Sequence, residues 1–124
     1  MEITNSNCLT RPCGKKDDFT YETVKLYKKI FSTEEIIIST WDNLEKEDVA
    51  KFKSIGCHVV LSAYPNSSGR GNVNYQTSYA GIRKAKELGC KYVIKSRTDQ
   101  RITKTNIVDY MRNLIEKFKP ENEI

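Results

Sequence analysis

Short apolar runs that alternate with segments of helical periodicity constrain the fold of this chain more than any other feature. The first run is three consecutive isoleucines at 36–38, bounded by polar residues. A continuous β-branched run of this kind is typical of a strand buried on both faces, as in a parallel sheet. Two further strands are predicted over 57–62 and 91–95.

Helices are predicted between and around these strands, over 18–31, 45–55, 74–88 and 105–118. Gly56 and Gly89 follow two of them and suit the left-handed conformation that often ends a helix. Strands that alternate with helices imply a parallel sheet with right-handed crossovers. The expected fold class is therefore α/β, with a Rossmann-like parallel sheet.

The length of 124 residues suits one domain rather than two. Residues 1–17 are polar and contain Pro12 and Gly14, so we interpret them as an N-terminal arm. The α/β domain is expected over 18–119, followed by a tail over 120–124.

The net charge of +5 leaves three kinds of partner open: nucleic acid, an anionic membrane face or a small phosphate-bearing ligand. Solvated helix faces account for most of the lysines. No signature of an RNA-recognition or helix-turn-helix domain accompanies the charge. No apolar run reaches the roughly 18 residues of a membrane-spanning helix, and the first residues do not resemble a signal peptide. A cytoplasmic protein is expected.

The cysteines are Cys8, Cys13, Cys57 and Cys90, and the sole histidine is His58. Their spacing does not match the four ligands of a structural zinc site, so ordinary reduced thiols are expected. Cys57 and His58 are neighbours, and on a strand their side chains would point to opposite faces. They are therefore a poor catalytic pair.

Polar clusters follow each predicted strand: Trp41-Asp42, the loop after Ser62, and residues 97–101. Open parallel sheets bind ligands outside the carboxyl ends of their strands. The three clusters are far apart in sequence, yet they should meet at one edge of the sheet.

Asp99 directly follows the third predicted strand, where its carboxylate could hold a divalent metal that bridges a diphosphate. It could equally cap the next turn or pair with Arg97 or Arg101. Both arginines are suited to hold phosphate oxygens through bidentate hydrogen bonds. A surface ion pair with Asp99 is the competing interpretation.

Four other residues are candidates for the same site. Asp42 could accept hydrogen bonds from a base or ribose, or cap the second helix. Trp41 could stack on a base or belong to the core. Asn74 and Gln76 begin the third predicted helix, and helix amino termini suit phosphate. Asn74 is also a plain N-cap candidate.

Taken in order, these segments resemble the WavE lipopolysaccharide synthesis family. The matching pieces are IIISTWD at 36–42, NVNYQTS at 72–78 with GIRKA at 81–85, and KYVIKSRTD at 91–99. The family pattern is similar to I-I-L-S-T-W, then N-x-Q-x-x-S with a G-L/I-x-x-A helix, then Y-V-L-K-x-R-T/S-D. The resemblance covers roughly residues 19–118.

The resemblance implies the nucleotide-sugar-binding half of a GT-A-like glycosyltransferase that acts in lipopolysaccharide or surface-glycan assembly. It assigns Asp99 to a metal–diphosphate, with Arg97 beside it. Asp42 would lie near the nucleotide base, and Asn74 and Gln76 would face the donor. The implied partners are a nucleotide-sugar donor and a glycan or lipid-linked glycan acceptor. Peripheral association with the inner face of a membrane fits this role, and nucleic acid is not expected.

This chain departs from the GT-A pattern in three places. Arg101 stands where an Asp-x-Asp motif has its second acid, so a Mn²⁺ or Mg²⁺ cofactor is open to question and the arginine could supply the cation's charge. A first strand is not evident in 1–17, and we expect the acceptor half, with any catalytic base, to be missing after 119. We therefore expect the donor-binding part of the enzyme, with catalytic residues unassigned. A non-catalytic fragment and a basic α/β module that binds nucleic acid are the alternatives.

Overall fold

The computed structural model describes residues 2–4, 19–63, 70–97 and 100–119, with side chains described for 19–63, 75–97 and 100–119. The protein is a mixed α/β structure with a parallel sheet. In chain order its elements are β1 (Glu2–Thr4), α1 (Phe19–Ile30), β2 (Ile37–Trp41), α2 (Lys46–Ser54), β3 (His58–Ser62), α3 (Arg70–Glu87), β4 (Lys95–Arg97) and α4 (Ile107–Lys117).

The sheet has the strand order β3-β2-β1-β4, and each neighbouring pair is parallel. The register aligns Thr4 with Ser39 on one side and with Arg97 on the other. On the next pair, Trp41 is aligned with Ser62. All strands therefore end at the same edge of the sheet, the carboxyl edge.

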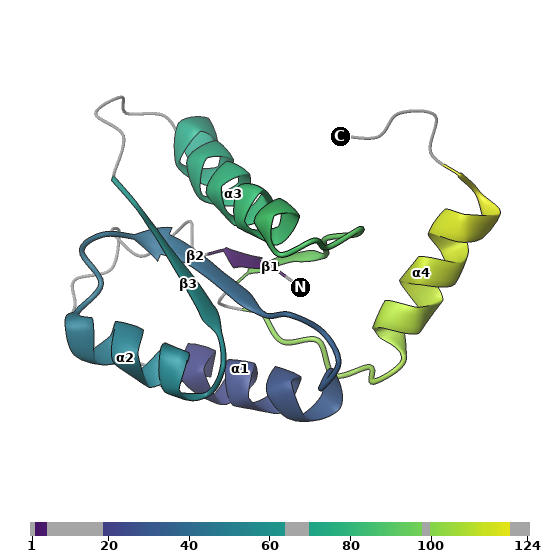
Figure 1. Ribbon diagram of the computed structural model, residues 1–124, viewed down its shortest axis with the longest axis horizontal. Helices are drawn as coiled ribbons and strands as arrows, with labels where there is room; N and C mark the ends of the chain where they lie inside the picture. Colours follow the sequence, from purple (N-terminus) through teal and green to yellow (C-terminus); the bar gives the residue numbers. More distant parts are fainter. Residues whose placement is uncertain (1, 5–18, 64–69, 98–99, 120–124) are drawn as a thin grey trace.

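Helices cover both faces of this sheet. Figure 1 shows α1 and α2 on one face and α3 on the other. Every residue of β2 is buried as a result. The core between α1, α2 and the sheet consists of Val24, Tyr27, Phe31, Ile36, Ile38, Phe52 and Cys57.

The sequence of α1 has the apolar spacing and the charge distribution of an amphipathic helix. Val24, Tyr27 and Phe31 recur at spacings of three and four residues, so they share the face that contacts the core. Glu22 lies in the first turn, and Lys28 and Lys29 lie in the last, which complements the helix dipole.

The opposite face is fixed by a buried hydrogen bond from Ser39 Oγ to the carbonyl oxygen of Thr77, 2.6 Å long. Both residues are fully buried. Ser39 belongs to β2 and Thr77 to α3, 38 positions later in the sequence, so this bond holds the helix against the strand.

Helix α4 stands to the side of the other layers (Figure 1). The segment before it is held by the Ile102 amide, which donates to the Tyr27 hydroxyl over 2.7 Å. Arg112 of α4 forms an ion pair with Glu34, which precedes β2; its Nη2 lies 3.2 Å from Glu34 Oε1. No residue of α4 is buried, although the helix carries an apolar stripe.

None of the described helices combines the length and the apolar character needed to cross a membrane.

Two expectations about the strands are wrong. Residues 2–4, assigned above to a polar arm without a strand, form β1 in the middle of the sheet. Its three residues are too short for any alternation pattern, and its position depends on pairing with β2 and β4. The last strand lies at Lys95–Arg97, and 92–94 precede it, because β4 follows the register of β1 and not the apolar run.

The other elements match their predictions within a few residues. The three isoleucines lead into the fully buried β2, as the β-branched run indicated. Gly56 and Gly89 have positive φ angles of 86° and 79°, which confirms their role at helix ends. Helix α3 begins at Arg70, four residues before the predicted start at Asn74.

Candidate functional site

The carboxyl edge of the sheet brings together residues from the ends of separate strands. Arg97 is the last residue of β4, and Asp42 directly follows β2; both are exposed. Arg97 lies level with Ser39 two strands away, and Asp42 lies three residues beyond Ser39. With strands about 4.8 Å apart and about 3.3 Å per residue, the two Cα atoms are roughly 14 Å apart. A ligand that contacts both has to be extended along this edge.

Arg101 reaches the same edge from the segment after β4. Its Nε donates a hydrogen bond to Thr23 Oγ1 over 2.9 Å, and its guanidinium carbon lies 4.5 Å from the centre of the Phe19 ring. Phe19 and Thr23 belong to the first turns of α1. These contacts leave the two terminal nitrogens of Arg101 without a hydrogen-bond partner among the described residues. The guanidinium is thus held in place against the start of α1.

The supports of Arg101 were not found from the sequence. Thr23 lies 78 positions before Arg101, and neither Thr23 nor Phe19 belongs to a recognisable motif. The available signal was topological: a helix that follows a parallel strand begins near the carboxyl edge of the sheet.

Asp42 is well placed for a polar ligand contact. Its backbone amide donates to the Ser62 carbonyl over 2.9 Å, which extends the pairing of β2 and β3 beyond Trp41. The N-cap residue of α2 is Glu45, so the alternative role of Asp42 as the cap of that helix is wrong. Its exposed carboxylate therefore faces solvent at the end of β2.

Trp41 does not belong to a ligand site. It is the last residue of β2 and is completely buried. A stacking role with a base is therefore wrong, and the alternative that places Trp41 in the core is confirmed. Trp41 lies two residues beyond the level at which β1 ends and is paired there with Ser62 of β3.

Gln76 and Asn74 lie in α3 and not at its start. Gln76 is exposed and immediately precedes the buried Thr77 that is bonded to Ser39. Asn74 lies inside the helix, so it is not the N-cap; its side chain is outside the described ones. The free amides at the start of α3 belong to residues nearer Arg70.

Asp99, the predicted metal and diphosphate ligand, lies outside the described residues. Among the residues that are described, no group of three histidine, cysteine or acidic side chains could hold a metal ion. A divalent cation takes several oxygen ligands, and Asp42 alone does not provide them. Arg97 and Arg101 are the charged groups of the described part of the edge that suit an anion.

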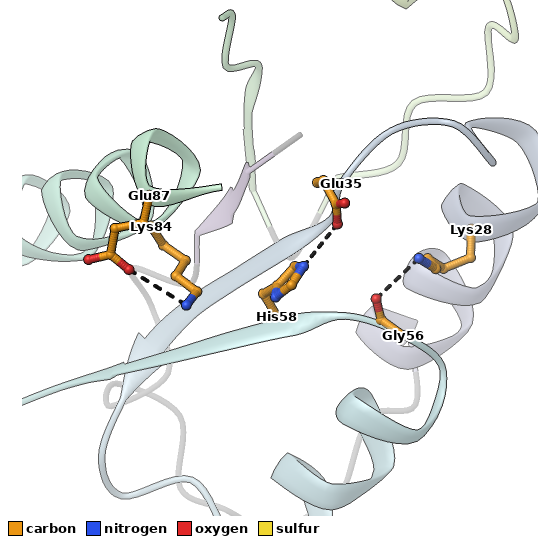
Figure 2. A network of polar contacts seen from close by, with 6 residues as sticks. All are labelled: Lys28, Glu35, Gly56, His58, Lys84 and Glu87. Atoms are coloured by element: carbon orange, nitrogen blue, oxygen red, sulfur yellow. Dashed lines mark hydrogen bonds and ion pairs between the residues drawn. The ribbon is translucent and has the colours of Figure 1, made fainter. Parts of the chain in front are cut away.

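The remaining titratable candidates lie at the opposite, amino edge of the sheet. His58 Nε2 lies 2.8 Å from Glu35 Oε2 at the beginning of β3 (Figure 2). The neighbouring Cys57 is buried, and burial raises the pKa of its thiol to about 11, an effect that the charge of Lys28 opposes. A protonated, buried thiol is a poor nucleophile. Neither residue can reach a ligand at the carboxyl edge.

An apolar pocket also lies at the amino edge, between the 92–94 segment and α4. Its lining includes Glu34, Ile94 and Met111. Glu34 precedes β2 and Ile94 precedes β4, so the pocket is separated from Asp42, Arg97 and Arg101 by the length of the strands.

Comparison with models of protein families, with curated proteins and with solved structures found no match for this chain.

Proposed function

We propose that this chain is the donor-binding α/β part of a GT-A-like glycosyltransferase, which transfers a sugar from a nucleotide-sugar to a lipopolysaccharide or surface-glycan acceptor. One observation carries the proposal: Arg97, Arg101 and Asp42 lie at the carboxyl edge of a parallel sheet. The sequence resemblance described above supports the same activity.

The strand order supports a nucleotide ligand. An order of 3-2-1-4 is the order in which the first four strands of Rossmann-like sheets are arranged. Ligands bind such sheets where the strand order reverses, which here is the crevice between β1 and β4. Arg97 ends β4 at this point, and Arg101 is anchored on the start of α1, the helix that follows β1.

The positions of the two arginines and of Asp42 indicate which part of a nucleotide-sugar each would contact. Arg97 and Arg101 suit the diphosphate, because guanidinium groups bind phosphate oxygens through paired hydrogen bonds. Asp42, roughly 14 Å from Arg97 by strand spacing, suits the hydroxyl and amino groups of the ribose and base. Arg101 would supply positive charge where an Asp-x-Asp motif would hold a metal.

The proposed reaction is displacement at the anomeric carbon. The acceptor oxygen forms a bond to this carbon while the bond to the diphosphate oxygen breaks, and the nucleoside diphosphate leaves with the electron pair. Arginines aimed at the leaving phosphate stabilise the negative charge that develops on it. The acceptor proton passes to a base that is not assigned among the described residues.

A thermal-shift panel on the purified chain tests donor binding. The ligands are UDP, GDP, CMP and their sugar conjugates, each with and without Mn²⁺ or Mg²⁺. A ligand at about 100 times its Kd adds about 2.7 kcal/mol of stability. A shift with one nucleotide would identify the donor class. A melt that no nucleotide shifts would contradict the proposal and favour a non-catalytic fragment.

Substitutions at the edge separate the contributions of charge and metal. Arg101→Ala should weaken nucleotide binding at least tenfold, since a charge-assisted hydrogen bond contributes about 1.5–3 kcal/mol. Arg101→Lys should recover part of that loss, because lysine keeps the positive charge but lacks the paired N–H donors of a guanidinium. Arg83→Ala removes an exposed arginine from the outer side of α3 and is the matched control. Asp99→Ala should abolish binding or its metal dependence; unchanged binding would remove Asp99 from the site.

A further inference from the structure

The outer side of α3 carries a stripe of exposed aromatic, aliphatic and basic side chains. Its members are Tyr75, Tyr79, Ile82, Arg83 and Lys86, all exposed. At 3.6 residues per turn they span roughly 100° of the helix circumference. We call this set the α3 stripe. It is directed away from the sheet, because the buried Thr77 and Ala85 lie on the other side of the helix.

The tyrosines of the α3 stripe form one continuous apolar surface. Tyr75 is 66% exposed and Tyr79 is 51% exposed. Their rings are stacked, with centroids 5.8 Å apart and planes 11° from parallel. Ile82 extends the same surface along the helix. Exposed apolar surface of this continuity usually marks an interaction site.

Positive charge accompanies this surface. The Arg83 guanidinium lies 5.8 Å from the centre of the Tyr79 ring, and Lys86 lies one turn further along the helix. The only acid in the described part of α3 is Glu87, whose carboxylate lies 3.6 Å from Lys84 (Figure 2). The cations of the α3 stripe are therefore not neutralised by acids on the same helix.

We infer that the α3 stripe docks the protein on an anionic lipid bilayer. Tyrosine is enriched at the headgroup level of membranes because its ring is apolar and its hydroxyl is polar. An interfacial helix buries an apolar face in the headgroup region while lysine and arginine attract anionic lipids. The α3 stripe has both properties on one side of one helix.

The composition of the stripe distinguishes a bilayer from the other occupants of such a surface. Ile82 gains nothing from a phosphodiester backbone but gains from burial at the acyl boundary. The two tyrosine rings stack on each other, whereas single-stranded nucleic acid needs rings free to receive bases. Two copies whose stripes pack in parallel would bring Arg83 and Lys86 close to their own equivalents, which like charges disfavour.

Docking through α3 would also position the candidate site. The helix begins near the carboxyl edge, because it follows β3, and Tyr75 lies in its first half. The edge that holds Asp42 and Arg97 would then lie beside the bilayer. The inference does not depend on the proposed glycosyl transfer, because vesicle binding is measured without any nucleotide.

Co-sedimentation with vesicles at low salt tests this inference. The vesicles are pure phosphatidylcholine or phosphatidylcholine with roughly one third phosphatidylglycerol, since the charge contribution needs anionic lipid. The wild-type chain should bind the anionic vesicles and bind neutral ones at least tenfold more weakly. Each cation contributes about fivefold, so the double substitution Arg83→Gln, Lys86→Gln should weaken binding roughly 25-fold.

Two further variants make the test specific. Tyr79→Ser keeps the charge and should weaken binding severalfold by removing apolar contact. The double substitution Lys29→Gln, Lys53→Gln removes the same charge from exposed positions on α1 and α2, and it should change binding less than threefold. Equal losses in the two double variants would overturn the inference, since generic charge would then explain the binding.

Other occupants have their own signatures. Absence of binding to anionic vesicles would overturn the inference directly. Binding of oligo(dT) that Tyr79→Ser abolishes, together with displacement from vesicles by oligo(dT), would assign the stripe to nucleic acid instead. A dimer in sedimentation equilibrium that Tyr79→Ser dissociates would assign it to a second copy of the chain.

Discussion

Replacing Tyr27 by phenylalanine should destabilise the protein by about 1–2 kcal/mol, because the Ile102 amide then loses its acceptor. Tyr27 is completely buried, and its hydroxyl oxygen accepts the Ile102 N–H over 2.7 Å. The substitution keeps the ring, whose centroid lies 5.6 Å from that of Phe31. The lost free energy therefore measures the bond that ties the segment after β4 to α1.

Urea unfolding at neutral pH, followed by the fluorescence of the buried Trp41, is the assay. With a slope of about 2 kcal/mol per molar urea, the midpoint should fall by roughly 0.5–1 M. Tyr79→Phe makes the same chemical change at an exposed position, and it should alter stability by less than about 0.5 kcal/mol. Hydrogen exchange of the Ile102 amide should accelerate in Tyr27→Phe alone. An unchanged midpoint together with unchanged exchange would refute the reasoning.

Three further substitutions test the packing of the fold. Ser39→Ala should cost about 1 kcal/mol in urea unfolding, since it removes the buried bond to the Thr77 carbonyl; no loss would mean that this bond does not hold α3. Gly89→Ala should lower the free energy of unfolding by about 1–2 kcal/mol because φ is +79°, although no atom lies within 4 Å of the added Cβ. An unchanged Tm would argue against this conformation. The pKa of the Cys57 thiol is raised from 9.0 to about 11. Between these values the unfolded chain loses the proton first, so stability falls as pH rises through this window and is retained below it. Cys57→Ala should show a shallower decline; identical pH slopes would contradict the shift.

Local sequence patterns were sufficient for the elements that are defined by their own side chains. The isoleucines at 36–38 lead into a strand buried on both faces. β-branched residues are enriched in strands, so this run was a reliable signal. The apolar spacing of α1 and the glycines that follow α2 and α3 likewise set these helices within a few residues.

Strands set by non-local pairing could not be predicted in this way. β1 has three residues, of which Ile3 alone is apolar, and it is stabilised by hydrogen bonds to both of its neighbours. β4 takes its register from β1, so it includes the polar Lys95 and Arg97 instead of the apolar 92–94 segment. Without β1, the sequence offered no reason to prefer that register.

The candidate site was predictable in outline, since parallel strands must end at one edge. Asp42 and Arg97 do lie at that edge, Asp42 directly after β2 and Arg97 at the end of β4. The sequence could not reveal that Trp41 is enclosed, because its burial depends on the tertiary packing around the end of β2. It also could not reveal the contacts of Arg101 with Phe19 and Thr23, which depend on the tertiary path of the chain after β4.

The most direct test of the central claim is an NMR titration of the isotope-labelled chain with the nucleotide that gives the largest thermal shift. Binding at the carboxyl edge predicts the largest amide shift changes at Asp42, Arg97 and Arg101, with little change around Ile94 and Met111 at the opposite edge. Changes concentrated around Ile94 and Met111, with none at Asp42 or Arg101, would contradict the account.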